Sequence, residues 1–296
     1  MYFDHKSFWL PKDVRREGEY EDASQVDPVR GIAAIADGVS SSIFSGSWAR
    51  LLVDGVVADV PNIYDGNSLW PWLAELRKQW AAPIDIESLA WHQKSKVQEG
   101  GASTLLAATV TDAPIDDSKA DGAYRLFAYA VGDCCLFHVR ENQVLRAFPI
   151  EQSRLFQTSP KTIGSVDMKL DHLIEFDTLE DYCDAGDLLV LCSDAVAAWA
   201  LEELEAGRNP QWENCWGLTQ EQFRGFVSQL RERNQIRFDD TTVLMLKLNE
   251  PPHETTSVAD SYAKKLEQQA EASWTEKVKG GAARLKDKID GWKGKS

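Results

Sequence analysis

Four aspartates stand at the ends of predicted buried strands, where carboxylates can meet and do chemistry. They are Asp37 after residues 31–36, Asp133 after residues 123–131, Asp194 after residues 188–192 and Asp239 before residues 241–248. The end of one strand and the start of an antiparallel neighbour lie at the same edge of a sheet. The four side chains can therefore converge on one rim. Glu21 and Asp22 would reach this rim from the segment that precedes the first strand.

Carboxylates that share a partly dry site raise one another's pKa, because each charge disfavours the next. A divalent cation removes this conflict and favours the ionised forms. Ligands that are all oxygen atoms favour Mg²⁺, Mn²⁺ or Ca²⁺ over zinc or copper. Two such ions about 4 Å apart could share one aspartate, activate a bridging water and hold a phosphoryl group. An isolated aspartate after a strand is usually a cap or turn residue, Asp194 above all, but four at compatible positions favour a metal site.

The elements that would position these residues follow from apolar runs and from helical spacing. Strands are predicted over residues 31–36, 102–110, 123–131, 135–140, 143–148, 188–192 and 241–248. Helices are predicted over residues 48–56, 68–80, 86–98 and 195–205, and from Thr219, which forms a capping-box pair with Gln222. Residues 1–30 are polar and carry no predicted element. Residues 150–186 are predicted to hold loops with one or two further strands.

The composition limits the classes of function. The chain has 296 residues, 43% of them hydrophobic and 27% charged, which is typical of a globular protein with a sizeable core. Its formal charge of −15 disfavours nucleic-acid binding and would repel a phosphorylated substrate unless a bound cation reversed the local field. Five cysteines without CxxC spacing predict buried free thiols in a reducing compartment. No signal peptide or membrane-spanning run is found, so a cytoplasmic protein is predicted.

Six short motifs resemble, in order and approximate spacing, those of the metal-dependent Ser/Thr protein phosphatases of type 2C. They are Glu21-Asp22, Asp37-Gly38, residues 101–104 (Gly-Ala-Ser-Thr), residues 131–133 (Val-Gly-Asp), residues 191–194 (Leu-Cys-Ser-Asp) and Asp239-Asp240-x-Thr242. The resemblance covers roughly residues 15–250. It implies an α+β fold, a four-layer α-β-β-α sandwich in which two antiparallel sheets are flanked by helix pairs.

The resemblance also implies roles for individual residues. The implied metal ligands are Glu21, Asp37, the Gly38 carbonyl, Asp133, Asp194 and Asp239. Asp37 would bridge two Mg²⁺ or Mn²⁺ ions, and Asp133 would hold a third, weaker one. Asp37 and Asp239 are the implied catalytic residues. Asp22 and Asp240 would lie behind the ligands, Asp22 next to water bound by the ions.

Two positions depart from the family pattern. Many members carry a histidine soon after the Asp-Gly turn, proposed as the acid that protonates the leaving group, and here that position is Val39. The family's phosphate-binding arginine aligns with Glu17. Arg16, one position away, is the predicted phosphate-binding residue.

The resulting prediction is hydrolysis of phosphoserine and phosphothreonine in proteins by a metal-bridging hydroxide, without a covalent intermediate. The implied partners are a phosphorylated protein substrate and a Ser/Thr kinase that acts on the same substrates. Val39 and the missing arginine leave an alternative open, a weak or inactive relative that binds phosphoproteins or a partner kinase as a regulator. A third alternative is an acidic structural domain with incidental Ca²⁺ binding.

Residues 1–250 are predicted to form the catalytic domain, and residues 251–296 an amphipathic helical tail. Pro251 and Pro252 mark the boundary, and apolar side chains recur at every fourth position beyond it. Residues 253–296 hold nine Lys and Arg against seven Asp and Glu, a charge too small to favour contact with a membrane. Docking on a partner or on the domain and simple tethering stay open as roles of the tail.

Overall fold

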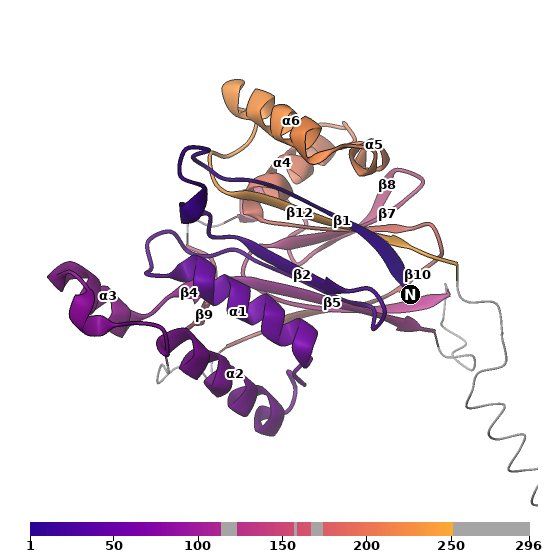
Figure 1. Cartoon of the computed structure of the whole chain (residues 1–296). Helices are drawn as coiled ribbons and strands as arrows, with labels where there is room; N and C mark the ends of the chain where they lie inside the picture. Colours follow the sequence, from indigo (N-terminus) through magenta and orange to yellow (C-terminus); the bar gives the residue numbers. More distant parts are fainter. Residues whose placement is uncertain (114–122, 157–158, 167–173, 251–296) are drawn as a thin grey trace, which may run out of the picture. The chain divides into compact units, whose positions relative to one another are not determined.

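Two antiparallel sheets of five strands each make up the centre of the fold in the computed structural model, which describes residues 1–113, 123–156, 159–166 and 174–250 (Figure 1). The first sheet has the order β1 (Phe3–Leu10), β12 (Thr241–Leu248), β11 (Leu188–Cys192), β7 (Cys135–Arg140), β8 (Gln143–Phe148). The second has the order β10 (Asp177–Cys183), β6 (Tyr124–Val131), β5 (Leu105–Asp112), β3 (Ile32–Ala36), β2 (Ala23–Asp27). A separate two-stranded ladder joins β4 (Ala102–Ser103) to β9 (Ile163–Gly164).

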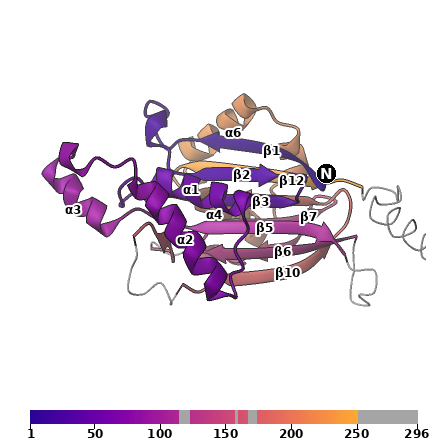
Figure 2. The same cartoon turned by 60° about the horizontal axis from the view of Figure 1, so that its bottom comes forward.

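Helices cover the outer face of each sheet, because the apolar side chains on that face must be buried against another element. Helices α1 (Ser45–Ala58) and α2 (Gly66–Ala81) lie on the sheet of β2, β3, β5, β6 and β10 (Figure 2). Helices α4 (Asp194–Glu205), α5 (Trp212–Trp216) and α6 (Gln220–Glu232) cover the other sheet. Helix α3 (Trp91–Glu99) extends beyond the sandwich and buries only Val97. The predicted four-layer α-β-β-α sandwich is confirmed.

The apolar side chains form three buried layers, one between the sheets and one beneath each group of helices. Strand β3 shows why an alanine-rich run can be a strand here. All five of its residues are buried, because one face meets the other sheet and the opposite face meets α1. Small side chains allow this close approach on both faces. The end of β3, which carries Asp37, is thus fixed from both sides.

Most predicted elements have the predicted bounds, and the differences have physical causes. Residues 86–98 hold a 3₁₀ turn (Ile86–Ser88) before α3, and residues 102–110 are divided between β4 and β5 at Thr104. Strands β1 and β2 were not predicted, because each is an edge strand with polar residues on its open face. Thr219 and Gln222 form the predicted capping box of α6. The predicted tail lies outside the described residues.

Four of the five cysteines are buried, and all five are free thiols. Within the part of the chain that the structure describes, no helix is long and apolar enough to span a membrane.

Candidate metal centre

Asp37 directly follows strand β3, and its backbone is held by Ser103 of β4 and by Thr104. Its carbonyl accepts hydrogen bonds from the Thr104 N–H at 2.9 Å and the Ser103 hydroxyl at 2.8 Å. Gly38 follows, and its N–H donates to the Glu21 carbonyl at 3.2 Å. A side chain at position 38 would place its Cβ 2.8 Å from that carbonyl oxygen, so only glycine fits. The Asp-Gly pair thereby joins the end of β3 to the segment that carries Glu21.

Asp133 follows β6 through Gly132, whose φ of 104° is a conformation that favours glycine. A Cβ there would lie 2.6 Å from Thr104 Cγ2, so the turn packs directly against the residue that holds Asp37. Asp194 begins α4 and Asp239 precedes β12. We call Asp22, Asp37, Asp133, Asp194 and Asp239 the rim cluster, because all five lie at one end of the sandwich.

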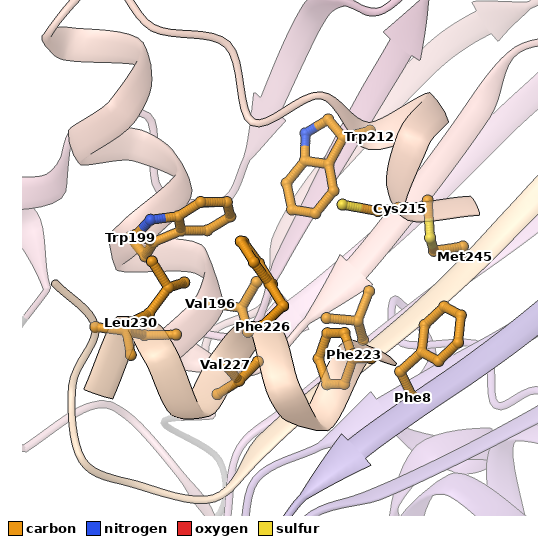
Figure 3. Close-up of a pocket in the computed structure, with 12 residues that line it drawn as sticks. Phe8, Val196, Trp199, Trp212, Cys215, Phe223, Phe226, Val227, Leu230 and Met245 are labelled. Carbon is orange, nitrogen blue, oxygen red and sulfur yellow. The ribbon is translucent and has the colours of Figure 1, made fainter. Parts of the chain in front are cut away.

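Helix α4 holds Asp194 rigidly, because residues 195–201 are all buried. Val196 and Trp199 of α4 face Phe223, Phe226 and Val227 of α6 around a small apolar cavity (Figure 3). Its volume of about 10 Å³ is that of a packing gap and not of a ligand site. A well-packed helix of this kind keeps its first residue in one place relative to the sheet.

The rim-cluster carboxylates act on one another electrostatically. Burial and the charges of Asp22, Asp194, Asp239 and Asp133, in that order, hold the pKa of Asp37 well above its usual range. Burial and the charge of Asp194 raise the pKa of Asp133 to about 7. Burial raises the pKa of Asp22 to about 7 as well, despite a hydrogen bond of 2.6 Å from the Thr242 hydroxyl. The structure thus brings together the four aspartates expected at strand ends, with Asp22 beside them.

Three buried oxygens of the rim cluster have no hydrogen-bond partner among the described residues: Asp22 Oδ1, Asp133 Oδ1 and Asp194 Oδ1. An unsatisfied buried acceptor is costly, and a carboxylate more so. Divalent cations that bind oxygen ligands would satisfy these atoms and lower the raised pKa values together. The donor set therefore fits Mg²⁺ or Mn²⁺.

The rim cluster is more widely spaced than a closed single-ion cage. Among the described residues, three metal-ligating side-chain atoms lie within 4.8 Å of one another only in His138, Cys183 and Asp187. Mg²⁺ usually keeps several waters and needs one or two carboxylates, so a spread of acidic groups suits it better than a tight cage. His138, Cys183 and Asp187 lie elsewhere in the sandwich, and Arg140 already binds both Asp187 oxygens at 2.8 Å.

Glu21 and Asp240 lie beside the rim cluster and hold each other in place. The Asp240 carboxylate accepts hydrogen bonds from the N–H groups of Lys12 at 2.7 Å and Glu21 at 2.8 Å. The Glu21 carboxylate binds the Lys12 ammonium at 2.7 Å and the Ser45 hydroxyl at 2.5 Å. Asp240 thus fixes the backbone that presents Glu21.

Arg16 and Val39 are the residues on which the two departures from the family pattern bear. Arg16 is 64% exposed and pairs with Asp13 and Glu19, neither of which is a predicted metal ligand. Val39 is half-buried, and its N–H donates to the Ala102 carbonyl at 2.9 Å. The apolar side chain of Val39 has no proton to give.

The sequence analysis missed three cationic residues that surround the rim cluster. Lys12 binds Glu21, and Arg237 Nη1 lies 3.0 Å from Asp194 Oδ2. Arg231 of α6 donates to the carbonyls of Asp239 at 2.5 Å and Pro11 at 2.9 Å, which ties the start of β12 to the end of β1. Only Arg237, two positions before Asp239, had a signal in the sequence, as a basic residue next to a predicted ligand.

A hollow of about 160 Å³ opens beside Asp133. Its lining includes Ile150, Leu155, Pro160 and Lys161. At about 30 Å³ for each water, it has room for several waters or one side chain. The rim cluster is thus next to a space that a substrate could enter.

Solved structures with the same fold are known. The chain is similar to PppA, described as a key regulatory component of T6SS in Pseudomonas aeruginosa, with 17% identity and a TM-score of 0.52 over 84% of this chain and 98% of that one. It is similar to the photosystem II phosphatase PBCP, with 15% identity and a TM-score of 0.52 over 84% of this chain and 100% of that one. No protein-family model and no curated protein matches the chain.

A third similar structure is the serine/threonine phosphatase PstP/Ppp of Mycobacterium tuberculosis. It shares 17% identity with a TM-score of 0.51, over 84% of this chain and 100% of that one. At such identities the likeness establishes the arrangement of sheets and helices. The chain therefore has the fold of the type 2C Ser/Thr phosphatases.

Proposed function

We propose that this chain is a metal-dependent protein phosphatase that hydrolyses phosphoserine and phosphothreonine. The observation that carries the proposal is the set of three buried, unpartnered carboxylate oxygens in the rim cluster. A protein gains no stability from such atoms, so a bound cation is the simplest reason for them. The type 2C fold supports the same conclusion.

The ligands of two Mg²⁺ or Mn²⁺ ions would be Asp37, the Gly38 carbonyl and Glu21 on one side, and Asp194 and Asp239 on the other. Asp37 would be shared between them, and Asp133 would hold a third ion. When bound, these ions would lower the pKa of water and neutralise charge on the phosphoryl group. The backbone contacts around Asp37 and the buried helix behind Asp194 keep the ligands in place before substrate arrives.

Lys12 has a supporting role in this proposal. Its ammonium binds Glu21 and the Ser40 hydroxyl, the latter at 2.5 Å, and it is mostly buried. It offsets part of the negative charge that would otherwise push Glu21 away from the rim cluster.

A second candidate function is a phosphoprotein-binding regulator with little or no turnover. Two observations favour it: Val39 cannot protonate a leaving serine oxygen, and Arg16 pairs with Asp13 and Glu19. One similar structure, PppA, is described as a regulatory component. A kinase that phosphorylates the same substrates is a proposed partner under either function.

The test is hydrolysis of p-nitrophenyl phosphate and of phosphoserine and phosphothreonine peptides, with Mn²⁺, with Mg²⁺ and with EDTA. We expect turnover that needs the metal and that Asp239→Asn abolishes. Asp4→Asn, which removes an exposed carboxylate on β1, is the matched control and should keep full activity. Peptide binding without turnover under either metal, by folded protein, would favour the regulator. Full activity of Asp239→Asn would contradict the site.

A further inference from the structure

Arg237 is a partly exposed cation that pairs with Asp194 of the rim cluster. It belongs to the loop between α6 and β12, between the buried Ile236 and the predicted ligand Asp239. Its Nη1 atom lies 3.0 Å from Asp194 Oδ2, and its charge also opposes the raised pKa of Asp133. The Arg237 side chain is 43% exposed, so one edge of the guanidinium can reach an incoming molecule.

Lys12 and Arg231, the other cations named at the rim, direct most of their donors to groups within the protein, and the Nε of Arg231, which has no partner among the described residues, is buried. The Lys12 ammonium binds Glu21 and Ser40. Arg231 donates to the carbonyls of Leu10, Pro11 and Asp239 and to the Thr241 hydroxyl. Arg237, by contrast, uses one of its five N–H donors in a hydrogen bond to Asp194.

An aromatic ring holds the Arg237 guanidinium at the rim. Its Cζ atom lies 5.1 Å from the centre of the Phe156 ring, a distance at which a cation is attracted to the ring face. Stacking of this kind leaves the edge of the planar fork free, and that edge matches two oxygens of a phosphoryl group. Phe156 follows Leu155, which lines the hollow beside Asp133.

The ion pair between Arg237 and Asp194 is expected to depend on what else binds Asp194. A divalent cation at Asp194 would use the same carboxylate charge and would repel the guanidinium. A phosphorylated substrate would bring new negative charge to the same place. An arginine that leaves a carboxylate for a phosphoryl group exchanges one anionic partner for another, because the guanidinium fork can bind the oxygens of either group.

We propose that Arg237 binds the phosphoryl group of the substrate, moving from Asp194 to the phosphoryl oxygens when a divalent cation occupies Asp194. This role rests on the proposed phosphatase function. It assigns to the loop before β12 the task for which the resemblance suggested Arg16.

The test compares Arg237→Ala and Arg237→Lys with Arg208→Ala. Arg208 is an exposed arginine that also pairs with one carboxylate, Glu203, on the far end of α4, so its loss is a matched control. For Arg237→Ala we expect KM for a phosphoserine peptide and the inhibition constant of inorganic phosphate to rise about tenfold or more. Arg237→Lys keeps the charge but not the fork, so a smaller rise is expected.

A second readout separates substrate binding from a structural role. Calorimetric titration of Mn²⁺ into EDTA-treated protein should show equal or tighter binding in Arg237→Ala, because a competing cation has gone. Weaker Mn²⁺ binding would mean that Arg237 positions Asp194 instead, and would overturn the proposal. An unchanged KM and an unchanged phosphate inhibition constant in folded Arg237→Ala would also overturn the proposal. So would a tenfold rise of these two constants in Arg16→Ala but not in Arg237→Ala. If the unaltered protein shows no metal-dependent turnover, the proposed function fails, and phosphate binding to the Mn²⁺-loaded protein still tests Arg237.

Discussion

Two groups of buried and half-buried acidic side chains lie in this sandwich, and they differ in how their charge is compensated. In one group Asp187 accepts hydrogen bonds from Arg140 Nε, Arg140 Nη2 and His138 Nε2, each at 2.8 Å. Asp181 also lies 3.5 Å from His138 Nδ1. We call His138, Arg140, Asp181 and Asp187 the Asp187 network. The rim cluster instead has unpartnered oxygens on Asp22, Asp133 and Asp194.

The two groups show opposite pKa shifts. Burial alone would raise the pKa of Asp187, but hydrogen bonds from Arg140 and His138 hold it well below its usual range. Burial raises the pKa of Asp22 and Asp133 to about 7, and too few donors lie nearby to reverse the shift. The Asp187 network therefore has its charge compensated within the protein and needs no ligand. This holds although its potential metal-ligating atoms lie closer together than those of the rim cluster. The rim cluster is the group in which we propose that cations bind.

Loss of a shared ligand in the rim cluster should have the largest effect. Asp37→Asn is expected to lower kcat/KM for a phosphoserine peptide by about a thousandfold or more, because metal ions supply several kcal/mol of transition-state stabilisation. The thermal midpoint of this variant without metal should stay the same or rise, because the substitution removes a carboxylate that the other carboxylates of the rim cluster repel. Equal activity of Asp37→Asn and Asp4→Asn would contradict the distinction between the groups.

The Asp187 network should respond in the opposite way. Asp187→Asn leaves Arg140 and His138 without their carboxylate and should cost about 3 kcal/mol in the free energy of unfolding, measured by urea denaturation. The folded fraction should keep its Mn²⁺ affinity and its kcat. A change in Mn²⁺ affinity as large as that of Asp37→Asn would mean that the metal binds in this network.

Added metal should stabilise the protein through the rim cluster alone. At a free Mn²⁺ concentration 100 times the dissociation constant, the free energy of unfolding should rise by about 2.7 kcal/mol. Differential scanning fluorimetry with and without EDTA measures the rise. Asp187→Asn should show the same increment and Asp37→Asn much less. An equal increment in both variants would place the ion elsewhere.

The pH dependence of stability should also separate the groups. Asp22 and Asp133 have pKa values of about 7 in the folded protein, above their unfolded values, so the folded state binds the extra protons. Without metal, stability should therefore fall as pH rises from 6 to 8, by about 1.4 kcal/mol for each such group. Asp187, with a lowered pKa, contributes a constant amount over this range.

Urea denaturation at both pH values, in EDTA, measures this fall. Asp22→Asn should make this fall smaller, and saturating Mn²⁺ should remove nearly all of it. A metal-free protein that is more stable at pH 8 than at pH 6 would contradict the account of the rim cluster.

Removal of residues in neither group should have the smallest effect. We expect the protein without residues 253–296 to hydrolyse p-nitrophenyl phosphate at close to the full rate, since none of these residues is a predicted ligand. A large loss of rate, in protein with an unchanged thermal midpoint, would mean that the tail contributes to the site.

The sequence was sufficient for the strands that carry the strongest apolar signal. Strands β7, β8, β11 and β12 have the predicted bounds, because each is a short buried run between turn signals. Strands β1 and β2 could not be predicted in this way. Phe3 and Phe8 are buried between exposed polar residues, and the pairing partner of β1 is β12, more than 200 residues away in the chain. Such an edge strand is stabilised by long-range pairing and not by local propensity.

The acidic part of the site was predictable because strand ends are predictable. Its cationic part was not. Arg237 pairs with Asp194 across 43 positions of the chain, and Lys12 reaches Glu21 only after β1 has joined the sheet. Equally, the pattern alone could not show that Arg16 pairs with Asp13 and Glu19. The partner of a flexible charged side chain is set by the tertiary structure. The spacing of residues along the sequence therefore carries little information about that partner.

Direct titration of Mn²⁺ tests the central claim that the rim cluster is completed by divalent cations. EDTA-treated protein is titrated by calorimetry, alongside Asp37→Asn and Asp187→Asn. We predict binding of at least two ions to the unaltered protein and to Asp187→Asn, and loss of at least one ion in Asp37→Asn. No binding at millimolar Mn²⁺, or unchanged binding in Asp37→Asn, would contradict the account.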